Sequence, residues 1–245
     1  MSREEGFTRH PFDIENGMQT SGLIPPRFLK TGHSHDRHST AYFGVAPSVF
    51  HALLKRWQRT KPIASLKRFT FLDLGAGMGR AMLLASEYPF RKVVGIELNP
   101  ILAGIARRNL AAWRTAGRSR VPTQIICEDA VAARIPGGPC LVFLFNPFGE
   151  LIMRRLLKRL STAFADRPGQ LDILYVNNEQ ERVIERLPGF TRLYLGHVRR
   201  SRADAIADHK IMANQPDGEY AATNYEDCSI WRWQPELPNQ DDGSG

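Results

Sequence analysis

The pattern of apolar and polar positions becomes regular near residue 69. From there to residue 233, short runs of aliphatic, β-branched and aromatic residues alternate with stretches of helical periodicity. This alternation is typical of a parallel sheet whose strands are joined by crossover helices. We therefore predict an α/β domain with strands at Phe69–Leu74, Lys92–Glu97, Thr123–Cys127, Leu141–Phe145, Leu171–Val176, Phe190–Leu195 and Cys228–Trp233.

Helical spacing of apolar residues predicts the elements between the strands. Between Glu150 and Phe164, leucines and an isoleucine recur near helical spacing while arginines and a lysine occupy the other faces. Asn99 is placed to cap the helix that begins at Pro100. The predicted helices are Pro47–Gln58, Arg80–Glu87, Pro100–Trp113, Glu150–Phe164 and Glu179–Leu187.

The two ends of the chain depart from this pattern. Residues 1–46 are rich in Pro, Gly, His and Ser, which predicts a partly irregular N-terminal extension whose following helix covers one edge of the sheet. The α/β domain is expected over residues 47–236, with a flexible tail at 237–245. Residues 197–227 form a long connection between the last two strands, and loops of that length are usually functional lids or disordered.

Composition limits the classes of protein to which the chain can belong. Of the 245 residues, 42% are apolar and 24% charged, which excludes intrinsic disorder, collagen-like fibres and coiled coils. No apolar run approaches the length of a membrane-spanning helix. The charged start Met1–Glu5 leads into no apolar signal segment, and three widely spaced cysteines indicate reduced thiols. We therefore expect a cytoplasmic protein with no membrane partner.

The net charge of +8 is concentrated in one part of the chain. Residues 49–120 carry fourteen basic and three acidic side chains. Such an excess can attract RNA or another acidic partner, so a non-catalytic module that binds RNA through this surface is an alternative function. However, no RNA- or DNA-reading motif accompanies the charge, and Arg107, Arg108 and Arg114 fit the solvated end of a helix. Nucleic acid is therefore possible as a partner but not favoured.

The most specific motif joins the first predicted strand to its helix. Asp73-Leu74-Gly75-Ala76-Gly77-Met78-Gly79-Arg80 has glycines at alternate positions, which permit positive φ and a close approach of a ligand to the backbone. Its N–H groups at the helix start favour an anionic or polar ligand. A dinucleotide-binding loop would need glycine or alanine at the position of Arg80, where a long cation obstructs helix–strand packing. An NAD-dependent oxidoreductase is therefore disfavoured.

This stretch resembles motif I of class I S-adenosylmethionine-dependent methyltransferases, and further signals follow in the family's order. Glu97 ends the second strand, where an acid can accept hydrogen bonds from both ribose hydroxyls. Glu128-Asp129-Ala130 follows the third strand, where the superfamily commonly places a side chain against the adenine amine; we favour Asp129 over Glu128. The opening segment, with Phe12-Asp13 and Thr20–Ile24, is similar to a poorly characterised bacterial branch.

The resemblance implies a fold, a cofactor and a set of site residues. The fold would be a Rossmann-like three-layer sandwich with a mostly parallel, seven-stranded sheet and an antiparallel edge strand. The enzyme would transfer a methyl group from S-adenosylmethionine to an acceptor that the sequence does not identify. The expected cofactor-binding residues are Asp73, Gly75, Ala76, Gly77, Gly79, Arg80, Glu97, Leu98, Asp129, Ala130 and Tyr42.

Asn146-Pro147-Phe148-Gly149 follows the fourth strand and carries the candidate catalytic residues Asn146, Pro147 and Phe148. The side-chain carbonyl of Asn146 and the backbone carbonyl of Pro147 can accept hydrogen bonds from an N–H and so orient a nitrogen lone pair. Amino-methylating relatives have Asn-Pro-Pro and an aromatic, so Phe148 departs from their pattern. A nitrogen on a protein or small molecule is slightly favoured as acceptor, and a strand-ending turn is the alternative reading of the motif.

Three other groups each admit two interpretations. Tyr42-Phe43-Gly44 is similar to the aromatic element that closes over the methionine end in relatives, or packs at a helix entry. Arg80 binds the methionine carboxylate or a substrate anion, or is a solvated helix residue. The histidines of the segment 33–38 suggest a metal, but without a further ligand pair at strict spacing a polar surface loop is favoured, and we predict no metal.

Overall fold

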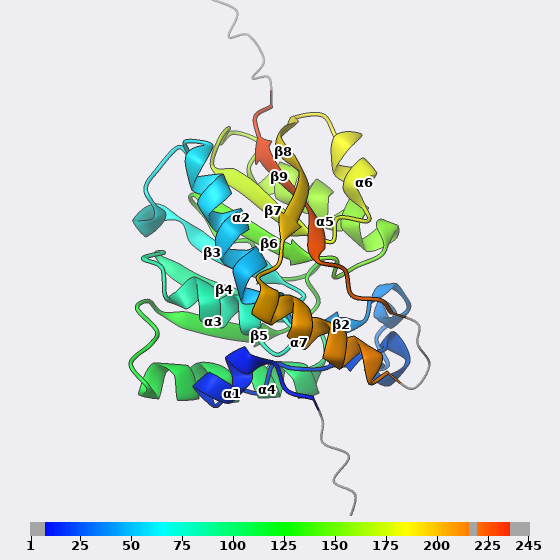
Figure 1. The fold of residues 1–245 in the computed structure, drawn as a ribbon. Helices are drawn as coiled ribbons and strands as arrows, with labels where there is room; N and C mark the ends of the chain where they lie inside the picture. The colour runs from blue at the N-terminus through cyan, green and yellow to red at the C-terminus, as the bar shows by residue number, and fades with distance from the viewer. Residues whose placement is uncertain (1–7, 216–219, 236–245) are drawn as a thin grey trace, which may run out of the picture.

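The computed structural model describes residues 8–215 and 220–235, which build a three-layer α/β arrangement with an N-terminal segment at the bottom of the view in Figure 1. Its seven-stranded sheet has the order β5-β4-β3-β6-β7-β9-β8. The five strands from β5 to β7 are parallel, and β9 runs antiparallel to both of its neighbours. The expected fold class, with its mostly parallel seven-stranded sheet, is thereby confirmed, but the antiparallel strand is β9, next to the edge strand β8 and not at the edge itself. The strands are β3 (Thr70–Leu74), β4 (Lys92–Glu97), β5 (Thr123–Cys127), β6 (Cys140–Phe145), β7 (Leu171–Val176), β8 (Phe190–Arg199) and β9 (Tyr225–Trp233).

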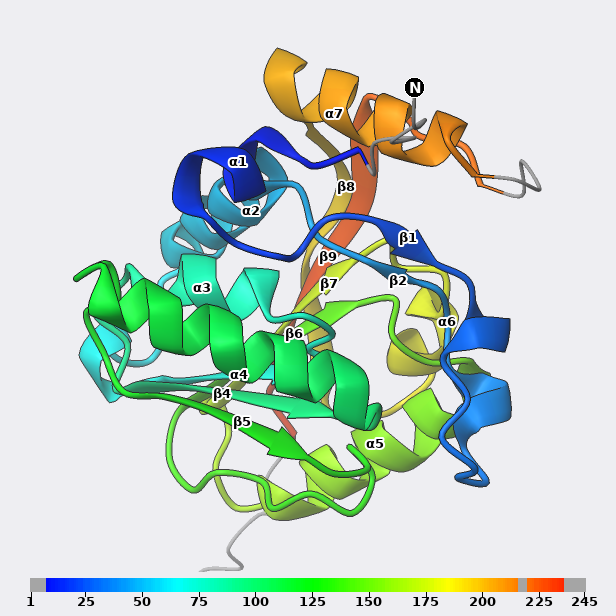
Figure 2. The same cartoon turned by 90° about the horizontal axis from the view of Figure 1, so that it is seen from below.

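Helices cover both faces of this sheet (Figures 1 and 2). One face packs against α2 (Pro47–Arg59), α3 (Arg80–Ser86) and α4 (Pro100–Thr115). The other face packs against α5 (Glu150–Ala163) and α6 (Glu181–Glu185). Asn99 caps α4 as predicted, since its side-chain oxygen accepts from the backbone N–H groups of Ile101 and Leu102.

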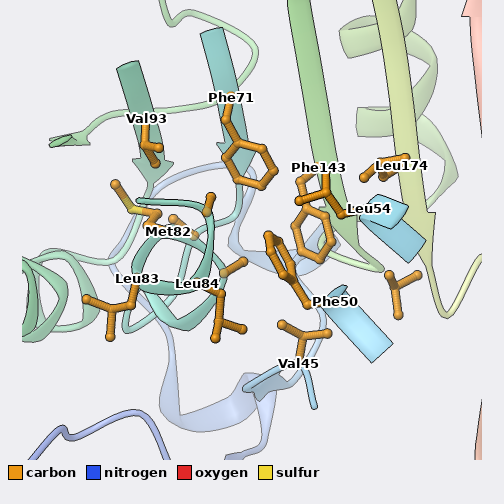
Figure 3. Packing of buried hydrophobic residues seen from close by; sticks show 14 of the residues in the cluster. Val45, Phe50, Leu54, Phe71, Met82, Leu83, Leu84, Val93, Phe143 and Leu174 are labelled. Carbon is orange, nitrogen blue, oxygen red and sulfur yellow. The ribbon is translucent and has the colours of Figure 1, made fainter. Parts of the chain in front are cut away.

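The central strands are buried on both faces, as parallel strands between two helical layers must be. All five residues of β3 and all six of β7 are buried. Phe71 and Phe143 lie side by side on neighbouring strands with ring centroids 5.8 Å apart, and Phe50 of α2 packs against both rings (Figure 3). This aromatic cluster fixes the sheet beneath the ends of β3 and β6, where the candidate site lies.

The position of α2 refines one prediction. We expected this helix to cover an edge of the sheet, and Arg56 does reach the edge strand β8, where its guanidinium lies 4.2 Å from the centre of the Tyr194 ring. The helix also extends over the face of the sheet, because Phe50 packs over the central strands β3 and β6 and Trp57 donates a hydrogen bond to Asp172 of β7 at 2.7 Å. The apolar stripe of α2 needs a broad apolar surface, which a face of the sheet offers and an edge does not. Its own sequence pattern does not show which surface it meets.

The N-terminal segment is fixed onto the domain by a buried polar centre. The carboxylate of Asp13 is fully buried and accepts hydrogen bonds from the backbone N–H of Thr20 and from the hydroxyls of Thr20 and Ser21, each at 2.6 Å. The segment contains α1 (Pro11–Asn16), two 3-10 turns (Pro26–Phe28 and Asp36–His38) and the antiparallel pair β1 (Leu23–Ile24) and β2 (Tyr42–Phe43). We call residues 29–45 the roof segment, because most of them line the pocket described below.

The connection between the last two strands also differs from the prediction. The strand β8 continues to Arg199, and residues 202–213 form the helix α7 (Arg202–Ala213), so this part is neither an irregular loop nor disordered. Arg200 and Asp208 make a buried ion pair with Nε and Oδ2 3.0 Å apart. Buried charged groups gave α7 a polar pattern in which no apolar face could be recognised. The predicted tail at 237–245 lies outside the described residues.

Within residues 8–215 and 220–235, no helix has the length and apolar character needed to cross a membrane.

Candidate functional site

A pocket lies at the carboxyl ends of the parallel strands, underneath the roof segment. Its walls come from the glycine loop after β3, the ends of β4 and β5, and the segment after β6. Every site residue predicted from the sequence lines this pocket except Gly79 and Asn146. This is the edge at which open α/β sheets bind their ligands.

The glycine loop has the backbone conformation that its sequence predicts. Gly75, Gly77 and Gly79 all have positive φ, at 79°, 55° and 88°. A Cβ on Gly75 would lie 2.5 Å from Cβ of Pro147, and a Cβ on Gly77 would lie 2.3 Å from the ring of Tyr42. The missing side chains therefore let Pro147 and Tyr42 approach the loop backbone.

The N–H groups of Gly75, Ala76 and Gly77 are used inside the protein. Gly75 and Ala76 both donate to the carbonyl of Ile96, at 2.9 and 3.0 Å, and Gly77 donates to the carboxylate of Glu97 at 2.7 Å. These three donors are thus used within the protein, and that of Gly77 faces the carboxylate of Glu97. The expectation of an anionic or polar ligand at the helix start stays a prediction. A pyrophosphate would lack the backbone donors that bind it in dinucleotide folds.

Asp73 presents a buried carboxyl group to the pocket. Asp73 is 3% exposed, and no hydrogen bond from the described part of the chain reaches its carboxyl group. Burial, together with the negative charge of Glu97, raises the pKa of Asp73 to about 8. A buried carboxyl without a protein donor fits a ligand that brings its own positive charge or donors.

Glu97 lies at the end of β4 and is held by the backbone. Its two oxygens accept from the N–H groups of Gly77 and Asn99, at 2.7 and 2.8 Å. Burial raises the pKa of Glu97, and these hydrogen bonds oppose that rise. Each carboxylate oxygen keeps a further lone pair, so Glu97 can also accept from ligand hydroxyls.

Asp129 and Ala130 line the pocket after β5, together with Leu98 after β4. Oδ1 of Asp129 accepts from the backbone N–H of Val131 at 3.0 Å. Oδ2 lies 2.9 Å from Nδ1 of His35 in the roof segment. Asp129 therefore faces both the pocket and the histidine loop, a contact that sequence spacing could not reveal.

Arg80 joins the glycine loop to the N-terminal segment. The guanidinium is buried, donates from Nε and Nη2 to the hydroxyl and carbonyl of Thr20, at 2.7 and 2.9 Å, and from Nη1 to the carbonyl of Gly44 at 3.1 Å. The interpretation as a solvated helix residue is thus wrong. Arg80 also lines the pocket, and its contact with a ligand anion stays a prediction.

Tyr42 packs over the glycine loop and against Met78 and Leu102, near the starts of α3 and α4. Its ring lies against Gly77 and its hydroxyl donates to the carbonyl of Thr20 at 2.8 Å. Burial raises the pKa of Tyr42, so the phenol stays protonated at neutral pH. Its predicted role of closing over a ligand agrees with this position but stays a prediction.

The roof segment holds the backbone of the Asn146-Pro147-Phe148 motif. Thr40 donates from its hydroxyl to the carbonyl of Asn146 and from its N–H to the carbonyl of Pro147, and Ser39 pairs with Phe148 in an antiparallel bridge. Asn146 has φ of 39°, and its side-chain oxygen lies 3.5 Å from the hydroxyl of Tyr175. Pro147 and Phe148 line the pocket, whereas Asn146 does not.

Sequence reasoning missed several residues of this site. Thr40 and Ser39 hold the roof segment on the Asn146-Pro147-Phe148 motif, and His35 reaches Asp129, yet none of the three belongs to a motif that spacing identifies. Asp13 and Thr20 carried a signal, since both belong to the opening segment whose resemblance to relatives was recognised. The sequence does not show long-range contacts of this kind, and only the folded structure reveals them.

Comparison with known proteins finds relatives among nitrogen methyltransferases. No family model matches the chain. It is 32% identical over 96 residues to a tRNA1(Val) (adenine(37)-N6)-methyltransferase of Porphyromonas gingivalis, which covers 39% of this chain and 37% of that protein. It is 51% identical over 43 residues to the mouse adenine nucleotide translocase lysine N-methyltransferase, covering 18% of each. The chain thus matches well under half the length of these relatives.

Solved structures with a similar course of the chain include two methyltransferases. Magnesium protoporphyrin IX methyltransferase from Synechocystis, with bound S-adenosylmethionine, has a TM-score of 0.47 at 14% identity, covering 75% of this chain and 77% of that one. An RNA methyltransferase from Salinibacter ruber, in complex with S-adenosyl-L-homocysteine, has a TM-score of 0.46 at 16% identity, covering 78% and 94%.

Three observations support the same resemblance. They are the glycine loop with its flanking acids, the strand order and the curated relatives. The loop Asp73–Gly79 follows the first parallel strand, and Glu97 ends the next one. The strand β9 lies antiparallel between β7 and β8. The chain is thus similar, over part of its length, to class I, Rossmann-like S-adenosylmethionine-dependent methyltransferases.

Proposed function

We propose that this protein transfers a methyl group from S-adenosylmethionine to a nitrogen nucleophile. The observation that carries the proposal is the pair of buried carboxyl groups, Asp73 and Glu97, which face one pocket from either side of the glycine loop. No hydrogen bond reaches the Asp73 carboxyl from the described residues, and Glu97 keeps free lone pairs. A ligand with one ammonium and two neighbouring hydroxyls satisfies both.

Each part of S-adenosylmethionine has a candidate partner in the pocket. Asp73 would hold the methionine ammonium, because a charged donor offsets the cost of its buried carboxylate. Glu97 would accept from the ribose hydroxyls through its free lone pairs. Leu98 and Ala130 would flank the adenine, with Asp129 as acceptor for its amine. Gly75, Ala76, Gly77 and Arg80 would form the wall along the methionine.

The chain's own residues then have to align the acceptor and exclude water. When bound, S-adenosylmethionine supplies a methyl group that its sulfonium already activates, so little acid–base chemistry is required of the protein. Tyr42 and the roof segment would close the pocket against solvent. Pro147 and Phe148 would form the wall against which the acceptor rests.

Two observations support nitrogen as the acceptor atom. The motif Asn146-Pro147 supplies an amide and carbonyls that can accept from an N–H, and both curated relatives named above are N-methyltransferases. In the described conformation, however, Thr40 uses the carbonyls of Asn146 and Pro147. Each carbonyl oxygen keeps a second lone pair, so the acceptor would share these carbonyls with Thr40 or would replace Thr40 after residues 38–40 have shifted.

Substrate class and compartment extend the proposal further. The Porphyromonas relative is named for adenine in tRNA and the mouse relative for lysine in a protein, so RNA bases and protein amines are the acceptors to test first. The three cysteines are free thiols, two of them buried, which supports a reducing compartment such as the cytoplasm.

Calorimetric titration and a labelling assay test the proposal in sequence. We expect S-adenosylmethionine and S-adenosylhomocysteine each to bind with one equivalent per chain. With radiolabelled S-adenosylmethionine and a lysate separated into protein, RNA and small molecules, we expect label in one of these fractions. Absence of heat with both ligands at millimolar concentration contradicts cofactor binding. Binding without label in any fraction, together with salt-sensitive retention of RNA, favours a non-catalytic RNA-binding module instead.

A further inference from the structure

The histidine loop of the roof segment meets the end of β5 at the edge of the pocket. One ring nitrogen each of His33 and His35, and a carboxylate oxygen of Asp129, lie within 4.8 Å of one another. His33 is exposed, and the other two side chains are partly buried. The sequence alone favours a polar surface loop here, because nothing in it indicates that a carboxylate from another element joins the two imidazoles.

We propose that His33, His35 and Asp129 form a binding site for a first-row divalent metal ion of the zinc type. Two imidazoles and one carboxylate are a ligand set that Zn²⁺ uses, and three protein ligands leave a fourth position open to water. Hard ions such as Mg²⁺ prefer oxygen ligands and should not compete. The proposal does not depend on methyl transfer, because metal binding is measured without cofactor.

The contact between His35 and Asp129 carries the proposal beyond proximity. Nδ1 of His35 is buried and lies 2.9 Å from Oδ2 of Asp129, yet among the described residues it has no hydrogen-bond partner of acceptable geometry. Two atoms that ligate one tetrahedral zinc ion lie about 3.3 Å apart, given metal–ligand bonds of about 2.0–2.1 Å. The nitrogen and the oxygen are thus close to the spacing of two ligands on a shared ion.

The loop that carries the two imidazoles is held in shape by a residue outside the proposed site. The carboxylate of Asp36 accepts from the N–H groups of Thr31 and Gly32, at 2.7 and 2.8 Å, and from the hydroxyl of Thr31 at 2.8 Å. Oδ1 of Asp129 is likewise fixed by the N–H of Val131, which leaves Oδ2 toward His35. Little ordering is then required beyond the approach of His33, whose side chain is exposed.

One neighbouring cation opposes the metal in the described conformation. Nη1 of Arg155 lies 3.1 Å from Nε2 of His35 and donates to it, which leaves the ring proton on Nδ1. Ligation through Nδ1 moves that proton to Nε2 or releases it, so the Arg155 side chain has to turn away. Arg155 is exposed and can do so. Replacing Arg155 by alanine should therefore strengthen metal binding. If the three side chains formed only a polar surface cluster, the same replacement would remove one of its contacts and weaken the cluster.

A bound ion would connect two parts of the chain that are distant in sequence. It would tie the roof segment, through His33 and His35, to the end of β5 at the edge of the pocket where Asp129 lies. We therefore expect zinc to raise the melting temperature of the full chain, because an ion that binds the folded state alone stabilises it by mass action.

Titration of the tag-free, EDTA-treated full chain with zinc chloride tests the site. We expect one equivalent to bind, and the variants His33→Ala, His35→Ala and Asp129→Asn each to weaken binding at least about tenfold. His38→Ala is the matched control, since His38 lies on the same loop but outside the cluster, and should bind zinc as the wild type does. Arg155→Ala should bind zinc more tightly than the wild type.

Two further measurements keep the test decisive. Cobalt should give the visible absorption bands of a four-coordinate ion in the wild-type protein, a readout that needs no variant. His33 does not line the pocket, so His33→Ala should lose zinc while keeping its affinity for S-adenosylhomocysteine, which separates this site from the proposed cofactor site. The proposal is overturned if zinc does not bind, or if binding survives in both His33→Ala and His35→Ala. It is also overturned if binding is lost only in Cys127→Ala, because the exposed thiol of Cys127 would then be the ligand.

Discussion

At the scale of single residues, Asp73 would bind the cofactor through a buried carboxyl group, and the same burial lowers the stability of the fold when that group is ionised. Its pKa is about 8 in the folded chain, against 3.8 for an ordinary aspartate. The folded state therefore holds the proton more tightly than the unfolded state. This contribution to the free energy of unfolding is fully present below about pH 4 and is lost as the pH rises through about 8.

The variant Asp73→Asn separates these two roles. Because asparagine carries no charge, we expect the apo variant to be more stable than the wild type by about 1–3 kcal/mol at pH 8, with little difference at pH 4. Its affinity for S-adenosylmethionine should fall at least about tenfold, since the ammonium loses its counter-charge. Urea unfolding between pH 4 and 9, with calorimetry at pH 7.5, measures both. Unchanged affinity would contradict the assignment of Asp73 to the cofactor.

Gly77 shows what the glycine loop requires of its residues. Alanine there has to adopt a φ of 55° and to place its Cβ 2.3 Å from the Tyr42 ring. We expect Gly77→Ala to destabilise the fold by about 2–4 kcal/mol, the sum of backbone strain and overpacking. Gly117→Ala is the matched control, because it has a φ of 69° with nothing within 4 Å of its Cβ. It should cost about 1 kcal/mol, the strain alone.

A double-mutant cycle attributes the difference to Tyr42. If the ring causes the excess, Gly77→Ala should cost at least about 1 kcal/mol less in a Tyr42→Ala background than in the wild type. Chemical denaturation of the four proteins measures this coupling. Equal costs in both backgrounds would mean that Tyr42 moves away freely and does not hold the loop.

At the scale of elements, one acid within an otherwise apolar strand ties α2 to the sheet. The carboxylate of Asp172 in β7 is fully buried and accepts from Nε1 of Trp57 at 2.7 Å and from Nε and Nη2 of Arg232 at 2.8 and 2.9 Å. Burial raises the pKa of Asp172, and Arg232 opposes that rise. Three elements, α2, β7 and β9, thus depend on one charge.

Removing either side of this contact should have unequal effects. Asp172→Ala leaves the Arg232 guanidinium buried without its partner, so we expect a loss of about 3–5 kcal/mol. Trp57→Phe removes one hydrogen bond and leaves a cavity beside the smaller ring, so it should cost about 2 kcal/mol. Glu150→Ala, which breaks the exposed pair with Arg154, is the control and should cost about 0.3–0.5 kcal/mol. Urea unfolding ranks the three, and a loss at Asp172 no larger than at Glu150 would contradict the argument.

The elements also show how far the sequence determines the fold. The central strands, α4 with its Asn99 cap and the glycine loop follow from local pattern, because burial on both faces and capping leave marks on neighbouring residues. The helix α7 was missed because its buried partners, Asp208 and Arg200, are charged and look like surface residues. Local pattern identifies elements whose burial is apolar and misses those whose burial is ionic.

The residues of the candidate site likewise fall into those that the sequence predicted and those that it did not. Asp73, Glu97 and Asp129 could be named because each follows or ends a strand, and the carboxyl ends of parallel strands meet at one edge. The roof segment could not be placed, since the contacts of Thr40 with Asn146 and of His35 with Asp129 span about 100 residues without any repeating pattern. The corrected role of Arg80 has the same origin, because its partner Thr20 lies 60 positions earlier.

At the scale of the whole molecule, the arginines along α4 lie away from the pocket. Leu102, near the start of α4, lines the pocket, whereas the exposed side chains of Arg107 and Arg114 lie further along this 16-residue helix. At 1.5 Å per residue, Arg114 is roughly 18 Å beyond Leu102 along the axis. The basic side chains Arg107 and Arg114 of this helix therefore lie away from the pocket.

This distribution predicts that RNA retention and methyl transfer respond to different residues. Reversing the charge at two positions on one face of α4, with Arg107→Glu and Arg114→Glu, should weaken the retention of RNA on filters and lower its salt slope by about two. Affinity for S-adenosylhomocysteine and the rate of label incorporation should stay unchanged, because both depend on the pocket at the carboxyl ends of the parallel strands. If incorporation into RNA falls in parallel with retention, α4 contributes to acceptor binding, and the acceptor has to extend from the pocket along this helix.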